Sequence, residues 1–274
     1  MKSDSESDPQ YLSHYTTLAG FQGIVDSRCL WASNASFLND RAELLLALDA
    51  SKKAISLLSS KKAMAAYAPL LKRVFDELSV GRRSEAFVSC FCKDDDNLSQ
   101  WRGYGGLMQG ISITFDRQLL TERLGEDHAR LYKVSYTKLS TARRLRDELA
   151  GELSRLADLR ELVAEGSEEQ RYKDLRSRAS ALLPKFKHLG FRDEREWRYV
   201  VQDRPDDDSV SFRPVGNKLV PYITIGDRGT PLPLVSVRVG PGTDQELTAR
   251  SIKEFLRARG YQAEVNVSDV PFRI

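Results

Sequence analysis

Two glutamates separated by one residue carry the sharpest chemical signal in this chain of 274 residues. Glu194 and Glu196 lie two residues apart at the start of a late strand, and on a strand residues two apart share a face. Neighbouring carboxylates raise the pKa of at least one of them and suit acid–base work or stabilisation of a developing cation. The alternative interpretation is a charge-laced edge strand, in which Arg192, Arg195 and Arg198 pair with Asp193 and the glutamates.

A histidine and a serine on other predicted strands are further candidates. His14 ends a strand just before a helix, where its ring is placed to hydrogen-bond a ligand hydroxyl or phosphate. Ser89 alternates with Val88 and Cys90 along a second strand. A purely structural role for a lone histidine is the competing interpretation. These residues lie far apart in the sequence, so their meeting in one cleft with Glu196 is a hypothesis.

A third group combines aromatic, basic and glycine residues in the segment 100–110. Trp101 and Tyr104 offer rings on which a planar ligand would stack, and Arg102 offers a partner for a phosphate. The glycines around them permit tight turns and close approach of a ligand. Their spacing is not the dinucleotide-binding fingerprint, and a plain loop is the alternative. The other two tryptophans, Trp31 and Trp197, are expected to be scaffold.

Composition limits the class of protein. Hydrophobic residues make up 41% and charged residues 30%, which is ordinary for a globular chain, and a net charge of +3 says little about nucleic-acid binding. Three cysteines cannot all pair, and scattered histidines do not suggest a metal cage, so we expect a cytoplasmic protein without a bound metal. No signal peptide or membrane-spanning run is expected. The common hydrolase, phosphate-loop and zinc-protease motifs do not occur.

The apolar pattern predicts the elements that position these residues. The expected strands cover 11–15, 86–91, 111–115, 131–136, 196–202, 211–215, 219–225, 235–239 and 263–267. The expected helices cover 18–26 with Thr16 or Thr17 as cap, 40–58 with Asp40 and Glu43 as a capping box, 63–78, 244–259, and a charge-rich stretch at 141–180. Early helices and late strands indicate an α+β domain over 11–274. A disordered lead-in over 1–10 and a solvated helical insert at about 141–183 complete the prediction.

The chain resembles a bacterial family named domain of unknown function 2971. The resemblance lies in the segments His14-Tyr15-Thr16, Leu30-Trp31-Ala32-Ser33, Phe37-Leu38-Asn39-Asp40, Leu98 to Gly105, Glu194 to Arg198 and Val239-Gly240-Pro241. It covers most of the chain from Tyr11 onward and by itself implies no activity.

The opening of the chain is also similar to ADP-ribosyltransferase domains of the DNA-modifying toxin branch. This second resemblance rests on His14 in a strand, an apolar helix ending in Ile24-Val25, and Leu30-Trp31. It implies a split mixed or antiparallel β-sheet that binds NAD as a substrate. Glu196 would then stabilise an oxocarbenium-like transition state, and Glu194 would orient the acceptor. The cofactor-binding residues it implies are His14, Thr16, Ser89, Trp101, Arg102 and Tyr104.

Three functions follow as expectations. The first is an NAD-dependent ADP-ribosyltransferase acting on nucleic acid or protein in bacterial conflict or phage defence. The second is a non-catalytic module that binds a nucleotide or nucleic acid in the same cleft. The third is a metal-free nuclease that uses Glu194, Glu196 and His14.

Overall fold

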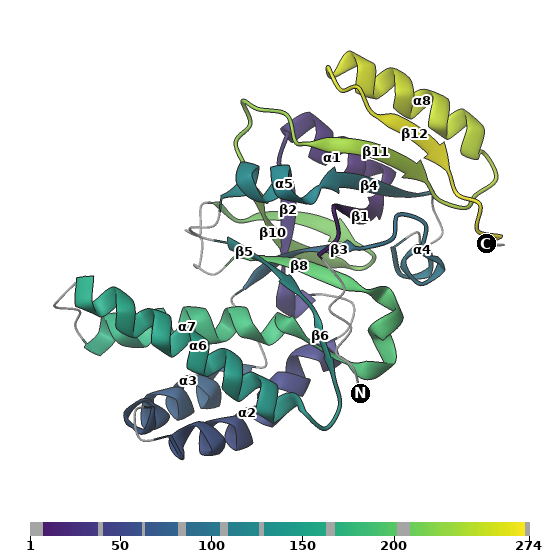
Figure 1. Cartoon of the computed structure of the whole chain (residues 1–274). Helices are drawn as coiled ribbons and strands as arrows, with labels where there is room; N and C mark the ends of the chain where they lie inside the picture. The colour runs from purple at the N-terminus through teal and green to yellow at the C-terminus, as the bar shows by residue number, and fades with distance from the viewer. Residues whose placement is uncertain are drawn as a thin grey trace.

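The computed structural model describes residues 8–37, 41–61, 64–81, 86–104, 109–125, 129–162, 168–201 and 209–271. Within these residues, ten strands form one sheet at the centre of the molecule (Figure 1). They are β1 (Tyr11–Thr17), β2 (Leu30–Asn34), β3 (Phe87–Cys92), β4 (Gly110–Asp116), β5 (Ala129–Lys133), β8 (Glu196–Val201), β9 (Ser211–Val215), β10 (Lys218–Ile225), β11 (Leu234–Val239) and β12 (Glu264–Val267).

The sheet is mixed and branches at one strand. Its main order is β12-β11-β4-β1-β3-β2-β10-β9, and β8 and β5 continue from β3 on a separate path. The β11–β12 pair is parallel, whereas the other pairs in this sheet are antiparallel. The predicted α+β class with a mixed sheet is therefore confirmed.

Helices cover both faces of the sheet and bury two separate apolar cores (Figure 1). The first core joins β3 and β8 to a layer made of α2 (Arg41–Ser59), α3 (Ala68–Gly81), α6 (Thr141–Leu162) and α7 (Glu168–Leu182). The second core joins the opposite face to α1 (Leu18–Ser27), α5 (Arg117–Leu124) and α8 (Gln245–Ala258). A short helix, α4 (Leu98–Tyr104), contacts β1.

The turn from β1 into α1 follows the predicted capping chemistry. Thr17 has extended backbone angles, and its hydroxyl accepts a hydrogen bond from the amide of Gly20 at 3.1 Å. At the other end, Arg28 adopts the left-handed conformation and its amide returns to the carbonyl of Val25. The N-terminus of α1 therefore follows directly on β1, the strand that carries His14.

The charge-rich helical stretch predicted at 141–180 as a solvated hairpin has one buried apolar face. Leu145, Leu149 and Leu153 of α6 are at most 1% exposed, and α6 packs chiefly against α2. Its charges do pair as expected, since buried Glu152 accepts from Arg155 and Arg178. The helical period places leucines on one face and charges on the other, so α6 closes the first core with its apolar face. The boundaries of the insert remain a prediction.

Three smaller predictions are corrected or left open. The single strand expected at 131–136 is two, because β5 pairs with β8 and β6 (Ser135–Thr137) turns away to pair with β7 (Phe186–His188). The helix expected at 63–78 is a 3₁₀ turn at 65–67 followed by α3. In the expected lead-in, the carbonyls of Pro9 and Gln10 are bound by Arg117, and residues 1–7 lie outside the described chain, as does Asp40.

Candidate functional site

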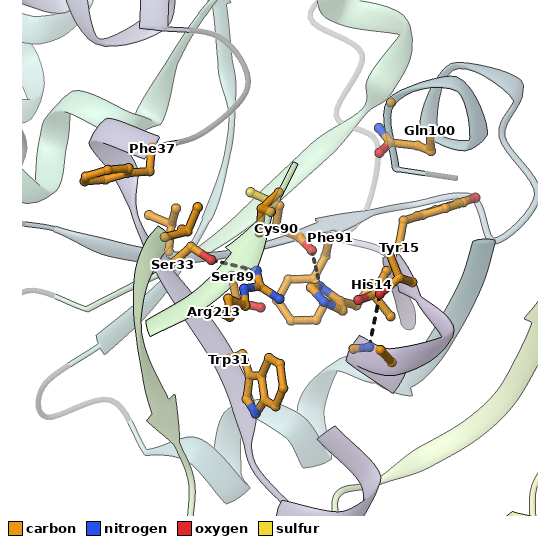
Figure 2. Close-up of a pocket in the computed structure, with 18 of the residues that line it drawn as sticks. His14, Tyr15, Trp31, Ser33, Phe37, Ser89, Cys90, Phe91, Gln100 and Arg213 are labelled. Carbon is orange, nitrogen blue, oxygen red and sulfur yellow. Dashed lines mark hydrogen bonds between the residues drawn. The ribbon is translucent and has the colours of Figure 1, made fainter. Parts of the chain in front are cut away.

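The sheet splits along one edge of β3. Its other edge pairs with β8 at six consecutive residues, from Phe87 to Cys92. On the split edge, β1 pairs only at Cys92, and β2 pairs only at Phe87 and Val88. The segment Ser89–Phe91 therefore has no strand on this edge among the described residues, and all three of its residues line a cavity of about 730 Å³. The predicted split sheet is present, and the split is where the cavity lies (Figure 2).

His14 bridges the split with its side chain. Its Nδ1 lies 2.8 Å from the carbonyl oxygen of Cys90, so Nδ1 carries the hydrogen and donates (Figure 2). Burial lowers the pKa of His14 to about 4, and the nearby positive charge of Arg213 acts in the same direction. At neutral pH the ring is neutral, which leaves Nε2 as a hydrogen-bond acceptor on a residue that lines the cavity.

Three polar side-chain atoms in the cavity wall are buried without a hydrogen-bond partner. They are Ser89 Oγ, Trp31 Nε1 and Arg213 Nε. Ser89 is 1% exposed, so its hydroxyl is cut off from bulk water as well. Buried polar groups in folded proteins nearly always have partners, and an exception calls for a specific explanation. Three residues of one cavity wall therefore each carry a polar atom that the described protein leaves unsatisfied.

Glu196, by contrast, has all its partners within the protein. Arg198 donates to both carboxylate oxygens at 2.7 and 2.9 Å, and Lys187 donates at 3.1 Å. The Cys90 thiol completes the set. Burial alone would raise the pKa of Glu196, but the charges of Arg198 and Lys187 outweigh it and lower the pKa to about 2.

The relation between the two glutamates is not the predicted one. Glu194 ends the 3₁₀ helix η4 (Leu189–Glu194), and Arg195 adopts the left-handed conformation before the strand begins at Glu196. The carboxylates therefore do not share a strand face, although both bind Lys187, that of Glu194 at 2.5 Å. Since the charges of Arg198 and Lys187 outweigh burial, the pKa of Glu196 falls instead of rising. Of the two, only Glu196 lines the cavity.

The charge-laced interpretation of this segment is partly confirmed. Arg198 pairs with Glu196, and Arg192 lies 3.7 Å from Asp193. Arg195 instead reaches Asp94, in the turn after β3.

His14, Ser89 and Glu196 all line the cavity, but from different faces of the sheet. Glu196 pairs with Cys92, and alternation along both strands places it on the face of Cys90, opposite Ser89. The Phe91 ring lies 5.7 Å from the His14 ring on the Ser89 face. One cavity touches both faces because it opens through the split between β1 and β2. Thr16 lines it too.

The segment expected to bind a planar ligand is largely structural. It is the short helix α4, not a loop, and Trp101 is 2% exposed against Tyr15, with its indole N–H donating to Asp96 at 2.7 Å. Neither Trp101 nor the exposed Arg102 lines the cavity, whereas Gln100 and Gly103 do. The side chain of Tyr104 lies outside the described part of the structure, as do Gly105 and Gly106.

Trp31 is the tryptophan that lines the cavity, contrary to its expected role as scaffold. Its indole is wedged against α1 at Gly23, where a Cβ atom would lie 2.3 Å from the ring. On the other side the ring packs 4.8 Å from that of Tyr222. A glycine facing a tryptophan is a contact between distant segments, which strand periodicity does not predict.

One stretch of the chain matches a known protein family. Residues 100–199 match the model of one family, described as a protein of unknown function (DUF2971). The predicted resemblance to this family is confirmed over these residues, whereas the prediction had it cover most of the chain from Tyr11 onward. The DUF2971 match runs from α4 to β8 and includes Trp101, Glu194 and Glu196, but not His14, Ser89 or Arg213. No curated protein and no solved structure matches the chain.

Arg213 is the residue of the cavity that sequence reasoning missed. It is a single cation in a short strand that otherwise carries Ser211, Phe212, Pro214 and Val215, and nothing in that pattern distinguishes it from an ordinary surface arginine. Among the described residues, no three His, Cys, Asp or Glu side chains are grouped to hold a metal ion. In the same part of the chain, no helix is both long and apolar enough to cross a membrane.

Proposed function

We propose that this protein is an NAD-dependent ADP-ribosyltransferase-like enzyme whose NAD lies in the split of the sheet. The observation that carries the proposal is the convergence of His14, Ser89 and Glu196, from β1, β3 and β8, on one cavity. A cavity of about 730 Å³ is in the range of small-molecule and cofactor sites. The DUF2971 match supplies no activity of its own.

Glu196 is the group proposed to face the nicotinamide ribose. Its low pKa keeps it ionised throughout the physiological range. A carboxylate offers about four acceptor sites, and here they are taken by Arg198, Lys187 and the Cys90 thiol. The thiol is the weakest of these donors and belongs to a residue that lines the cavity. A ribose hydroxyl would replace it with a stronger hydrogen bond.

The other residues would orient the dinucleotide. The bond from Nδ1 to Cys90 holds the neutral His14 ring in place, and Nε2 would accept a hydrogen bond from a ribose hydroxyl or from the amide of NAD. Ser89 would supply its unpartnered hydroxyl. Trp31, which is half-buried and lines the cavity, would take the stacking role that the sequence suggested for Trp101. Glu194 holds Lys187 against Glu196 and so acts as a positioning residue.

The proposed step is a substitution at the anomeric carbon of the nicotinamide ribose. The bond from this carbon to the nicotinamide nitrogen breaks, and nicotinamide leaves as a neutral molecule with the bonding electron pair. The ribose carries the resulting positive charge, which a buried carboxylate stabilises. The acceptor then forms a bond to the same carbon and releases its proton to water. No oxidant or reductant is required.

The test is nicotinamide release and label transfer from NAD, with a cell lysate as the source of acceptor. Wild-type protein should release nicotinamide and label a lysate component, whereas Glu196→Gln should lose most of this activity. Glu148→Gln is the matched control, because it removes a carboxylate bound to a buried lysine, Lys185, outside the cavity. Absence of release by the wild-type protein, or full turnover by Glu196→Gln, would contradict the proposal.

Glu196→Gln also disturbs a buried ion pair, so a second variant is needed. Ser89→Ala removes an unpartnered hydroxyl and should leave the fold intact. It should raise the KM for NAD, because the hydroxyl would lose its ligand partner. Unchanged kinetics in Ser89→Ala, together with an unfolded Glu196→Gln protein, would count against the assignment of this cavity.

One observation favours a second candidate, a non-catalytic module that binds a nucleotide or nucleic acid. The Glu196 carboxylate is fully bonded by two cations and a thiol, as in a structural ion pair. If that pairing persists with ligand bound, NAD should bind to Glu196→Gln and wild-type protein alike, and neither should release nicotinamide.

The biological setting belongs to the proposal as well. A cytoplasmic location, an acceptor that is nucleic acid or protein, and a role in bacterial conflict or phage defence are its remaining parts. The three cysteines, Cys29, Cys90 and Cys92, are free thiols, which suits a reducing compartment.

A further inference from the structure

Arg213 is a half-buried cation with no anion beside it. Among the described residues no carboxylate is paired with its guanidinium, and its Nε has no hydrogen-bond partner. Its recorded hydrogen bond is from Nη2 to the hydroxyl of Ser33 at 2.9 Å (Figure 2). The guanidinium lies 5.4 Å from the Trp31 ring centroid and 5.8 Å from that of Tyr222. These contacts fix its position, and none of them, within the described part of the chain, supplies a negative charge.

An unpaired charge in such a place is costly. Burial without a counter-ion disfavours the charged form, and it lowers the pKa of Arg213 from its ordinary value. Proteins keep buried charges where a partner is present for at least part of the working cycle. The planar fork of a guanidinium suits phosphate oxygens, which it binds through two parallel hydrogen bonds.

The N-terminus of α1 faces the same cavity. Leu18, Ala19 and Gly20 of its first turn line the wall, next to the capping residue Thr17. The first turn holds no acidic residue that would neutralise the positive end of the helix dipole. The Gly20 amide already donates to Thr17, so a phosphate would bind the amides of Leu18 and Ala19.

Ser89 provides an independent indication of a ligand. Its hydroxyl is 1% exposed, has no partner and belongs to a residue of the cavity wall. A phosphate or sugar oxygen would satisfy it. The acidic residue of the wall, Glu196, is neutralised by Arg198 and Lys187 and does not repel an anion.

We propose that Arg213 and the N-terminus of α1 form the phosphate-binding part of the cavity and hold the diphosphate of a nucleotide. This assignment rests on the proposed function in one respect, since the nucleotide there is the ADP portion of NAD. It adds a residue from β9 and a helix end that neither family resemblance points to. Figure 2 shows Arg213 and His14 on opposite sides of the split, with Ser89 on the strand between them.

The experiment is calorimetric titration of the full-length protein with ADP and with adenosine. Wild-type protein should bind ADP, and Arg213→Gln should weaken it about 10- to 100-fold in Kd, the effect of losing a charge-assisted bond. Arg213→Lys should fall between the two, because it keeps the charge and loses the fork. Arg250→Gln, on the exposed side of α8, is the matched control and should bind ADP as the wild type does. Adenosine should bind weakly and equally to wild type and Arg213→Gln.

Two results would overturn the assignment. One is that Arg213→Gln binds ADP as tightly as the wild-type protein does. The other is that the wild-type protein binds ADP and adenosine equally well. Nicotinamide release separates this assignment from the proposed enzyme. If ADP binding depends on Arg213 but NAD is never cleaved, the phosphate site stands and the transferase does not. If NAD is cleaved with an unchanged KM in Arg213→Gln, the transferase stands and the phosphate site does not.

Discussion

Arg198 and Arg213 are both buried or half-buried cations beside the same cavity, and they differ in how their charge is balanced. Arg198, on β8, donates to both oxygens of Glu196 and to the carbonyl of Pro184. Arg213, on β9, has a serine hydroxyl and two aromatic rings around it. The Arg198 end of the cavity is therefore complete without a ligand, whereas no described residue places an anion at the Arg213 end. Substitution of Arg198 should therefore reduce mainly the stability of the fold, and substitution of Arg213 mainly the binding of a ligand.

The largest expected effect is on stability at the two arginines. Arg198→Met leaves Glu196 buried with Lys187 as its remaining cation, and loss of one partner of a buried pair costs about 3–5 kcal/mol. Arg213→Met removes an unbalanced charge along with its ring contacts, so the change should be about 1 kcal/mol or less. Urea unfolding followed by circular dichroism measures both. Equal losses of unfolding free energy in the two variants would show that both arginines stabilise the ligand-free fold.

The second effect is on the pH dependence of stability. The folded pKa of His14 is about 4 against an ordinary 6.5, so the unfolded chain takes up a proton between these values and the folded chain does not. Stability should fall as pH drops from 6.5 to 4, by roughly 3 kcal/mol from this group. The decline should disappear in His14→Gln and shrink in Arg213→Met, which removes one cause of the low pKa. An identical decline in all three proteins would contradict a buried neutral His14.

Glu196 should affect the stability of the fold at more acidic pH than His14 does. Its folded pKa of about 2 lies below the ordinary 4.5, so its stabilisation is complete above 4.5 and is lost as pH falls through 2. Unfolding curves between pH 6.5 and 4 therefore report on the His14 end, and those below 4.5 report increasingly on the Arg198 end.

The third effect compares two tryptophans. Trp101→Phe removes the hydrogen bond to Asp96 within a buried contact and should cost about 1–3 kcal/mol of unfolding free energy. Trp31→Phe removes an N–H that has no partner and the ring atoms that pack against Gly23, so it should cost about 1 kcal/mol, from lost packing and not from a hydrogen bond. For ligand binding the order should reverse, with ADP or NAD weakened by Trp31→Phe and not by Trp101→Phe. Calorimetric titration of the two variants decides whether Trp31 is the ligand-facing ring.

The smallest effect compares two serines, each 1% exposed. Ser13→Ala breaks a hydrogen bond of 2.9 Å to Thr114 and should lose about 1 kcal/mol. Ser89→Ala breaks none in the ligand-free protein and should leave stability unchanged or slightly higher. Thermal unfolding of the two variants measures the difference. A clear loss in Ser89→Ala would mean that its hydroxyl already has a partner in the free protein.

Much of the local structure could be predicted from residue patterns. The alternation Ile111, Ile113 and Phe115 marks β4, and the threonine before Leu18 marks the start of α1. The pairing of Arg198 with Glu196 was one of two interpretations of the late glutamates. Arg195 could not be assigned in the same way, because its partner Asp94 lies about a hundred residues earlier.

The site was predicted less completely than the fold. His14, Ser89 and Glu196 stood out because polar residues on predicted strands are unusual, and they do line one cavity. Arg213 did not stand out, since a lone arginine near a strand edge is common in sequences. Its unbalanced charge is visible only once β9, β10 and β2 are side by side.

The sequence by itself determined which segments are strands and helices, because periods of 2 and 3.6 residues record which side chains face a core. It also determined that glutamate, histidine and serine would lie at strand positions. Only the tertiary structure decided that β1 and β2 part along β3 and that Glu196 and Ser89 reach the cavity from opposite faces. It also decided which arginine, among the residues described, has no counter-charge beside it. Those outcomes depend on contacts between segments far apart in the chain, and local periodicity does not record them.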